Sequence, residues 1–226
     1  MNRFMRTELL IGNEAMERLQ AAHVAIFGLG GVGSFTAEAL ARSGIGHLVL
    51  IDKDVVDITN INRQLIALDQ TIGQAKVDVM AERILQINPN CQVSRKQLFF
   101  GESTANEVFT ERIDFIADAI DTISAKIQLV LEADARSIPI ISSMGAANKL
   151  DPGQFQILDI KKTSVDPIAK IMRKELKQRG FTNPLPVVCS TEQPRRTSKP
   201  PASIAFVPPV VGLMLASYIV KQIAKI

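Results

Sequence analysis

The sequence predicts an α/β fold: a Rossmann-like, mostly parallel sheet with helices on both faces, followed by a C-terminal antiparallel strand and helix elaboration. Short apolar runs alternate with helical patterns from Val24 to about Gly145, which is typical of parallel strands joined by crossover helices. A glycine-rich turn follows the first apolar run, and an aspartate ends the second. Together these observations indicate a nucleotide-binding βαβ unit.

The elements of the N-terminal part can be assigned in order. Residues 1–22 have a helical pattern that is interrupted around Gly12. A strand at 24–27 leads through the glycine turn into a helix at 34–43, which Gly44 ends. The further elements expected are a strand at 48–51, a helix at 74–86, strands at 93–100 and 113–117, a helix at 124–136 and a strand at 138–142.

The pattern changes after Gly145. Residues 153–160 alternate between apolar and polar side chains, which predicts a half-exposed antiparallel strand. The remaining elements expected are a helix from Asp166-Pro167 to Gly180, a strand at 185–189, a basic proline-rich loop at 192–202 and a buried helix at 210–223. We expect one domain over 1–226, with a nucleotide-binding core at 1–145 and a substrate-binding elaboration at 146–226. No membrane span is expected, because prolines and a glycine interrupt the apolar run at 207–220.

The glycine turn has a separate physical role for each of its main glycines. Gly28 lets the chain turn off the strand, Gly30 leaves room for a phosphate, and Gly33 lets the helix sit close to the strand. Asp52 follows Gly33 by nineteen residues, the place for a carboxylate that accepts a ribose hydroxyl. The alternative is a glycine turn that only packs. The turn alone does not distinguish ATP from a dinucleotide.

Three charged residues favour a triphosphate that is cleaved. Arg63 and Lys76 are cations that could stabilise a leaving pyrophosphate, and Asp121 is a carboxylate that could hold magnesium. All three follow strands at their carboxyl ends, where open α/β sheets bind ligands. A NAD(P)-dependent oxidoreductase, or a nucleotide sensor without catalysis, remains as an alternative from another class.

The charge of the chain is unevenly distributed. Its net charge is +3, but residues 161–199 carry ten basic and three acidic side chains. This excess suggests a surface for a polyanion, although any single residue could be simply solvated. The two cysteines, Cys91 and Cys189, form no CxxC pair, so we do not expect a disulfide framework. We expect a cytoplasmic location for the same reason. We expect both cysteines to be structural.

Six motifs, in this order, resemble the ubiquitin-activating superfamily, whose bacterial members include adenylyltransferases of molybdopterin and thiamine biosynthesis. They are GLGGVG at 28–33, IDKD at 51–54, NINRQ at 60–64, GQAK at 73–76, INP at 87–89 and DAID at 118–121. The resemblance implies that Asp52 binds ribose and that Asp121 lies beside Mg²⁺ as its ligand. The nucleotide-binding set that it implies is Gly28, Gly30, Gly31, Gly33, Asp52, Asp54, Asn60, Arg63, Gln64, Lys76 and Asp121, with Arg63, Lys76 and Asp121 also catalytic.

The start of the chain adds a further likeness. RFMR at 3–6 is similar to an Arg-aromatic-x-Arg motif of the superfamily, in which an arginine reaches the nucleotide of the neighbouring subunit. Arg6 matches that arginine. The resemblance therefore implies a homodimer in which Arg6 is a catalytic residue at the partner's ATP.

The C-terminal third resembles the branch of tRNA threonylcarbamoyladenosine dehydratases, through LDP at 150–152, the basic helix after 166–167, VCSTE at 188–192 and GL at 212–213. Sulfur-carrier adenylyltransferases typically carry two zinc-binding CxxC pairs, which this sequence lacks. The resemblance implies ATP-dependent cyclisation of the modified adenosine in tRNA, with Mg²⁺ and, as a candidate, Na⁺ or K⁺. A cysteine desulfurase or sulfur-acceptor protein is a candidate partner. The alternative enzyme is an adenylyltransferase that activates a ubiquitin-like sulfur carrier.

Overall fold

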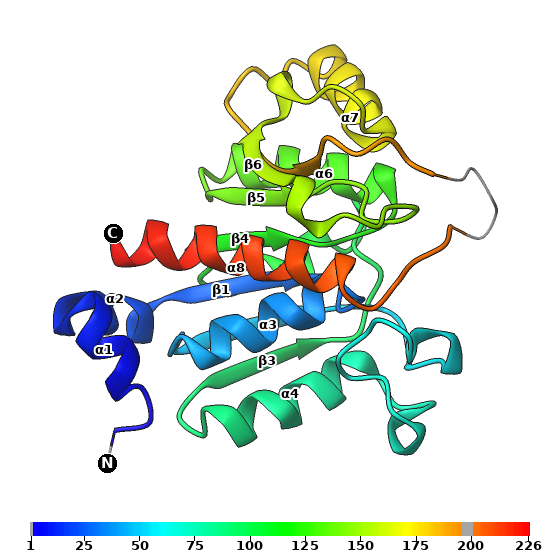
Figure 1. The fold of residues 1–226 in the computed structure, drawn as a ribbon. Helices are drawn as coiled ribbons and strands as arrows, with labels where there is room; N and C mark the ends of the chain where they lie inside the picture. The colour runs from blue at the N-terminus through cyan, green and yellow to red at the C-terminus, as the bar shows by residue number, and fades with distance from the viewer. Residues whose placement is uncertain (1, 196–200) are drawn as a thin grey trace.

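The computed structural model describes residues 2–195 and 201–226, and in these residues seven strands form one sheet (Figure 1). The strand order is β3-β2-β1-β4-β5-β7-β6, and every neighbouring pair is parallel except β6 with β7. The strands are β1 His23–Phe27, β2 His47–Ile51, β3 Gln92–Lys96, β4 Phe115–Asp118, β5 Ile140–Ser143, β6 Phe155–Asp159 and β7 Pro186–Ser190. The mostly parallel α/β fold and the antiparallel C-terminal strand are confirmed.

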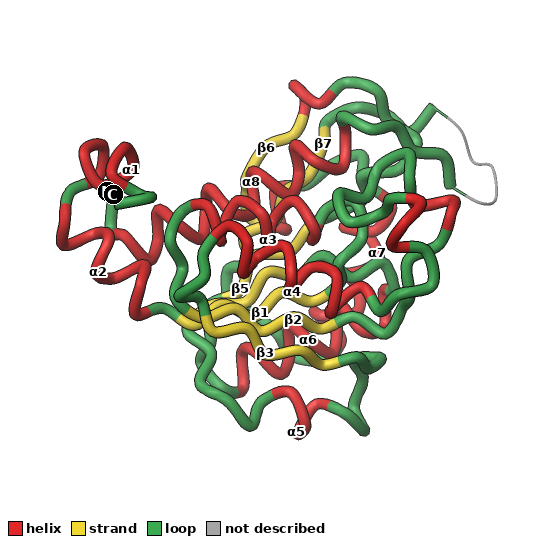
Figure 2. The backbone as a smooth tube through the Cα atoms, turned by 90° about the horizontal axis from the view of Figure 1, so that it is seen from below, coloured by secondary structure: helices red, strands yellow, loops and turns green. Residues whose placement is uncertain are grey.

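Helices cover both faces of the sheet, as Figure 2 shows: α3, α4 and α8 lie on one face, and α5 and α6 on the other. Alternate residues of each central strand explain this arrangement, since Val24 and Ile26 face the first layer while Ala25 and Phe27 face the second. The helices are α1 Met5–Ile11, α2 Asn13–Ala21, α3 Gly33–Arg42, α4 Lys76–Ile87, α5 Ala105–Val108, α6 Ile123–Ala135, α7 Pro167–Gln178 and α8 Val207–Ala224.

Two boundaries differ from the expectation for identifiable reasons. The strand expected at 93–100 ends at Lys96, because its neighbour β2 ends at Ile51, the residue that pairs with Lys96. Helix α8 begins at Val207 and includes two prolines in its first turn, where the backbone N–H groups have no partner within the helix in any case. The short helix α5 was not expected from the sequence.

The N-terminal helical segment is divided where the sequence interrupts it. Gly12 has a φ of +84°, a backbone conformation that glycine adopts without a steric penalty, and it separates α1 from α2. Helix α2 buries Met16 and Leu19 in the core and lies beside α8, so that an N-terminal helix packs against the C-terminal helix (Figure 1). On α1, by contrast, Leu9 and Leu10 are largely exposed.

The C-terminal segment extends the same sheet. Strand β7 pairs with β5 through Ser142 with Val187, so the sheet continues across the expected boundary at residue 145. Helix α8 is, among the described residues, a helix long and apolar enough to cross a membrane. In this fold it packs against α2, α3 and the sheet, and Val211, Leu215 and Ile219 are fully buried. Its apolar composition is therefore accounted for by core packing.

Two histidines stack at the amino ends of β1 and β2. The rings of His23 and His47 are 3.8 Å apart between centroids, and their planes are nearly parallel. Burial lowers the pKa of His23 below its ordinary value of 6.5, and the charges of His47 and Arg112 act in the same direction. The carboxylates of Asp114 and Glu111 oppose this effect without reversing it. The folded protein therefore favours neutral His23.

This histidine makes stability depend on pH. Because the folded pKa is below the unfolded one, the unfolded chain binds more protons near pH 6.5. The contribution of neutral His23 to the unfolding free energy is fully present above that pH, and it is lost as the pH falls through the folded pKa. We expect His23→Gln to reduce the loss of unfolding free energy between about pH 7.5 and about pH 5, measured by urea titration. Identical pH profiles for the variant and the wild type would contradict this prediction.

Candidate nucleotide site

The glycine loop lies between the ends of β1 and β4, where the strand order reverses and where open α/β sheets bind ligands. Gly28 has a φ of +86°, and a Cβ on it would lie 2.7 Å from the carbonyl oxygen of Ala119. A Cβ on Gly33 would lie 1.7 Å from the carbonyl oxygen of Gly28, so only glycine lets α3 begin this close to β1. Gly30 faces open space, apart from the side chain of Gln64.

Asp52, directly after β2, joins the glycine loop to the segment that follows it. One carboxylate oxygen accepts the N–H of Leu29 at 2.5 Å, and the other accepts the N–H of Asp54 at 2.8 Å. The side chain is half-buried. Because each carboxylate oxygen can accept a second hydrogen bond, Asp52 remains able to accept one from a ribose hydroxyl.

The polar segment after β2 turns back onto the loop. Asn60 is buried at the end of a short 3₁₀ helix, where its Oδ1 accepts the N–H of Asp57 at 3.2 Å. The next turn places Arg63 against Gly31: a Cβ on that glycine would lie 3.2 Å from Cγ of Arg63. The guanidinium of Arg63 donates through Nη1 to the carbonyl oxygen of Thr59 at 3.1 Å. Arg63 thus borders the loop, and the carbonyl oxygen of Asn60 accepts the N–H of Arg63 at 3.0 Å in the turn that carries it.

Gln64 has a polar atom that lacks a partner. Its side chain is buried, and its Oε1 makes no hydrogen bond to any described residue. Its Nε2 is the atom closest to a Cβ built on Gly30, at 3.8 Å. A buried acceptor without a partner costs about 1–3 kcal/mol, so a ligand or a water beside the loop is expected. The residues around the loop therefore fit a bound nucleotide.

Lys76 is a nearly buried cation at the start of α4. Its Nζ lies 3.3 Å from Oδ2 of Asp54, and only 5% of the residue is exposed. Burial acts to raise the pKa of Asp54, but the hydrogen bond from Lys53 and the charge of Lys76 outweigh it and lower that pKa. Asp54 therefore stays ionised and holds Lys76 close to the loop that follows β2.

β4 ends in a buried ion pair that the sequence analysis missed. Oδ2 of Asp118 lies 2.9 Å from Nζ of Lys126, and both side chains are inaccessible to solvent. Asp118 also accepts the N–H of Ile120 at 3.1 Å, while Lys126 donates to the carbonyl oxygen of Ile120 at 3.0 Å. The pair thus fixes the turn that carries Asp121, whose side chain is exposed. The sequence could have indicated Asp118 as a site residue, since Asp118 is the first residue of the DAID motif that ends with Asp121.

Arg6 is the one predicted site residue that lies elsewhere. It is exposed on α1, and α1 and α2 precede β1, so they lie at the amino edge of the sheet (Figure 1). The glycine loop lies at the carboxyl edge. A single copy of the chain therefore does not bring Arg6 to the other predicted residues, and its action in a neighbouring subunit stays a prediction.

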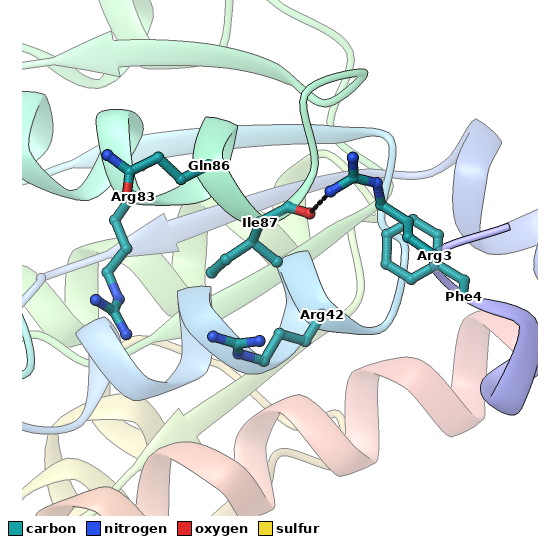
Figure 3. A pocket seen from close by; sticks show the side chains of 6 residues that line it. All are labelled: Arg3, Phe4, Arg42, Arg83, Gln86 and Ile87. Atoms are coloured by element: carbon teal, nitrogen blue, oxygen red, sulfur yellow. Dashed lines mark hydrogen bonds between the residues drawn. The ribbon is translucent and has the colours of Figure 1, made fainter. Parts of the chain in front are cut away.

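A cavity of about 470 Å³ also lies at the amino edge (Figure 3). Arg42 and Arg83, which line it, both pair with Glu38, and Arg3 donates to the carbonyl oxygen of Ile87 at 2.6 Å. Helices α3 and α4 end at this cavity, whereas the predicted nucleotide residues lie where the same helices begin. The cavity is therefore separate from the nucleotide site.

Metal-binding side chains are sparse. Within residues 2–195 and 201–226 no cluster of three or more His, Cys, Asp or Glu side chains could hold a metal ion. Magnesium is commonly held by one or two carboxylates together with substrate phosphates and water. Asp121 as a ligand of Mg²⁺ stays a prediction, in which phosphates and water supply the other ligands.

The chain is similar to known proteins along its whole length. The model of the ThiF family matches residues 2–226. The tRNA threonylcarbamoyladenosine dehydratase of Bacillus subtilis is 48% identical over 243 residues, covering 100% of this chain and 96% of the relative. The Escherichia coli molybdopterin-synthase adenylyltransferase is 31% identical, covering 70% of this chain and 62% of the relative.

A solved structure shares the fold as well. The crystal structure of the E. coli tRNA N6-threonylcarbamoyladenosine dehydratase in complex with ATP has a TM-score of 0.94 and 36% identity, covering 99% of this chain and 94% of that chain. Both the family model and the full-length relative therefore agree with the likeness seen in the motifs. The chain belongs to the ThiF family.

Proposed function

We propose that this chain catalyses the ATP-dependent dehydration of threonylcarbamoyladenosine in tRNA. The observation that carries the proposal is the match to the B. subtilis dehydratase at 48% identity across 96% of that protein. The site supports it, because a glycine loop, an unpaired Gln64 acceptor and the cations Arg63 and Lys76 gather at one edge of the sheet. The E. coli protein of similar fold was solved with ATP, which agrees with a triphosphate and not a dinucleotide.

The proposed reaction has two steps. An oxygen of the threonyl carboxylate attacks the α-phosphorus of ATP, and the bond to pyrophosphate breaks. The carbamoyl group of the same nucleoside then attacks the activated carbonyl carbon, loses a proton and displaces AMP, which keeps the carboxylate oxygen. In this proposal, Arg63 and Lys76 stabilise the charge that develops on pyrophosphate.

The nucleophile in this scheme belongs to the substrate. Burial raises the pKa of Cys91 and of Cys189 to about 11, so both are neutral thiols at neutral pH. Both side chains are buried, which suits the structural role expected for them. No thioester step is part of the proposal.

The proposal includes a magnesium ion that Asp121 and the phosphates of ATP would hold. When bound, it would neutralise charge on the triphosphate. A monovalent cation, Na⁺ or K⁺, is a further candidate and rests on the family resemblance alone. The same holds for a cysteine desulfurase or sulfur-acceptor partner, whereas the proposed cytoplasmic location rests on the two unpaired cysteines.

We assign tRNA binding to the elaboration at 146–226. Lys170, Lys174 and Lys177 are exposed on α7 at helical spacing, so they present one basic face to solvent. Other basic residues of the region are used within the fold: Arg173 donates to the carbonyl oxygen of Thr163 at 3.0 Å. Also predicted from the sequence were Lys161, Lys162 and Arg195, which are exposed, and Arg196 and Lys199, which lie outside the described residues.

A homodimer is part of the proposal and makes a testable prediction. If Arg6 acts at the partner's nucleotide, a mixed dimer of Arg6→Ala and Lys76→Ala chains contains one complete site. Random mixing of two inactive variants should therefore recover about a quarter of the wild-type pyrophosphate release. No recovery, with mixed dimers verified by mass spectrometry, would remove Arg6 from the site.

Substrate-dependent pyrophosphate release tests the proposed reaction. Release should require tRNA that carries threonylcarbamoyladenosine, and unmodified tRNA should not support it. Release that occurs only with a carrier protein ending in Gly-Gly would instead identify a sulfur-carrier adenylyltransferase. That second candidate is favoured by a single observation, the 31% identity to molybdopterin-synthase adenylyltransferase.

A further inference from the structure

A line of hydrogen bonds joins the loop after β5 to Arg63. The N–H of Asn148 donates to the carbonyl oxygen of Ala202 at 2.8 Å, and Oδ1 of Asn148 accepts the N–H of Ala202 at 2.9 Å. The next carbonyl oxygen, of Ser203, accepts Nδ2 of Asn62 at 3.2 Å. Oδ1 of Asn62 then accepts Nη1 of Arg63 at 3.0 Å.

Asn148 has the backbone conformation that this arrangement requires. Its φ is +61°, in the left-handed region that asparagine tolerates better than most residues. Its carbonyl oxygen also accepts the N–H of Arg195 at 2.8 Å. A single residue thus fixes the chain at two points, Arg195 and Ala202, before the chain enters α8. There Pro208 lies against Gly31 of the glycine loop.

The carbonyl oxygen of Ser203 decides which way the Asn62 amide points. A backbone carbonyl can only accept, so the NH₂ group of Asn62 must face Ser203. The amide oxygen must then face Arg63. With the amide reversed, the NH₂ group would oppose the guanidinium, and two donors would meet without an acceptor.

We infer that Asn62 and Asn148 are positioning residues for Arg63, and that they act through the backbone of Ala202 and Ser203. Asn148 fixes the position of that backbone, and Asn62 bonds to it and directs its own amide oxygen toward Arg63. The guanidinium of Arg63 is held in a fixed orientation as a result. The inference rests on the proposed function, in which Arg63 contacts the phosphates of ATP. It gives the C-terminal segment a role in nucleotide binding.

ATP affinity, measured by calorimetry with Mg-ATP and without tRNA, tests the inference. Asn62→Ala should weaken binding about fivefold to tenfold, as expected for the loss of one hydrogen bond to a charged group that acts indirectly. Asn148→Gly, which keeps the left-handed φ and removes the side-chain acceptor, should weaken it about threefold. In an Arg63→Ala background, neither change should have more than about a twofold further effect, because coupled residues are not additive.

The controls separate positioning from general damage. Asn148→Asp keeps the Oδ1 acceptor and should restore wild-type affinity, and Asn106→Ala, at an exposed position on α5, should leave it unchanged. Full additivity with Arg63→Ala, or wild-type affinity in Asn62→Ala, would overturn the inference alone. Wild-type affinity in Arg63→Ala would overturn the phosphate contact in the proposed function, and the inference with it.

Discussion

Lys76→Ala is expected to lower the rate of adenylate formation by about 10²–10³, the effect of removing one preorganised group that stabilises transition-state charge. Lys76 is the cation best placed for this role, since it is 5% exposed and is held 3.3 Å from Asp54 at the start of α4. A buried cation interacts more strongly with a phosphate than a solvated one, because solvent screens it less. Single-turnover pyrophosphate release would measure the rate.

The second lysine that pairs with Asp54 provides a matched control. Lys53 pairs with the other oxygen of Asp54 at 2.7 Å, but its side chain is 54% exposed. Lys53→Ala should change the rate by no more than about twofold, because exposed ion pairs contribute little. The fold should survive Lys76→Ala, since the Asp54 left behind is 46% exposed and can be hydrated. A near-normal rate in Lys76→Ala would show that the phosphates lie elsewhere.

Gly33→Ala should abolish ATP binding together with much of the stability. The new Cβ would lie 1.7 Å from the carbonyl oxygen of Gly28, and neither backbone can withdraw without moving α3 away from β1. We expect a loss of about 3 kcal/mol, the upper end for overpacking, and a fall in Tm of about 10 °C. Thermal unfolding and calorimetry with ATP would measure the two effects.

Gly30→Ala is the matched change that should leave the fold intact. The nearest atom to its Cβ would be Nε2 of Gln64 at 3.8 Å, an ordinary contact. The methyl group would occupy the space that the second glycine leaves for a phosphate, so we expect unchanged Tm and ATP binding weakened by about tenfold or more. Unchanged affinity would place the triphosphate away from this glycine, and an unchanged Gly33→Ala variant would contradict the loop geometry itself.

Local patterns predicted much of the site because each role depends on neighbouring residues. The conformation of Gly28 and the tight contact at Gly33 follow from a strand that turns directly into a helix, and both were expected. Lys76 and Asp54 are joined by one loop that returns to the same edge of the sheet. Their contact is therefore a consequence of the βαβ connection.

Other features depend on contacts between distant segments, which no local pattern contains. Asn148 and Ala202 are separated by fifty-four positions, and their pairing requires the chain to cross from β7 to the start of α8. The ion pair of Asp118 and Lys126 could have been suspected from the motif, but its burial becomes visible only in the folded sheet. The position of Arg6 at the far edge is likewise a property of the topology.

The central claim is that the chain dehydrates threonylcarbamoyladenosine in tRNA, and mass spectrometry of tRNA nucleosides tests it most directly. Modified tRNA incubated with the protein, ATP and Mg²⁺ should yield a nucleoside lighter than threonylcarbamoyladenosine by the mass of one water molecule, with one AMP formed for each nucleoside converted. Lys76→Ala should convert less than about a hundredth as much nucleoside in the same time, in line with the expected loss of rate. An unchanged nucleoside mass with folded, ATP-binding protein would contradict the proposed function.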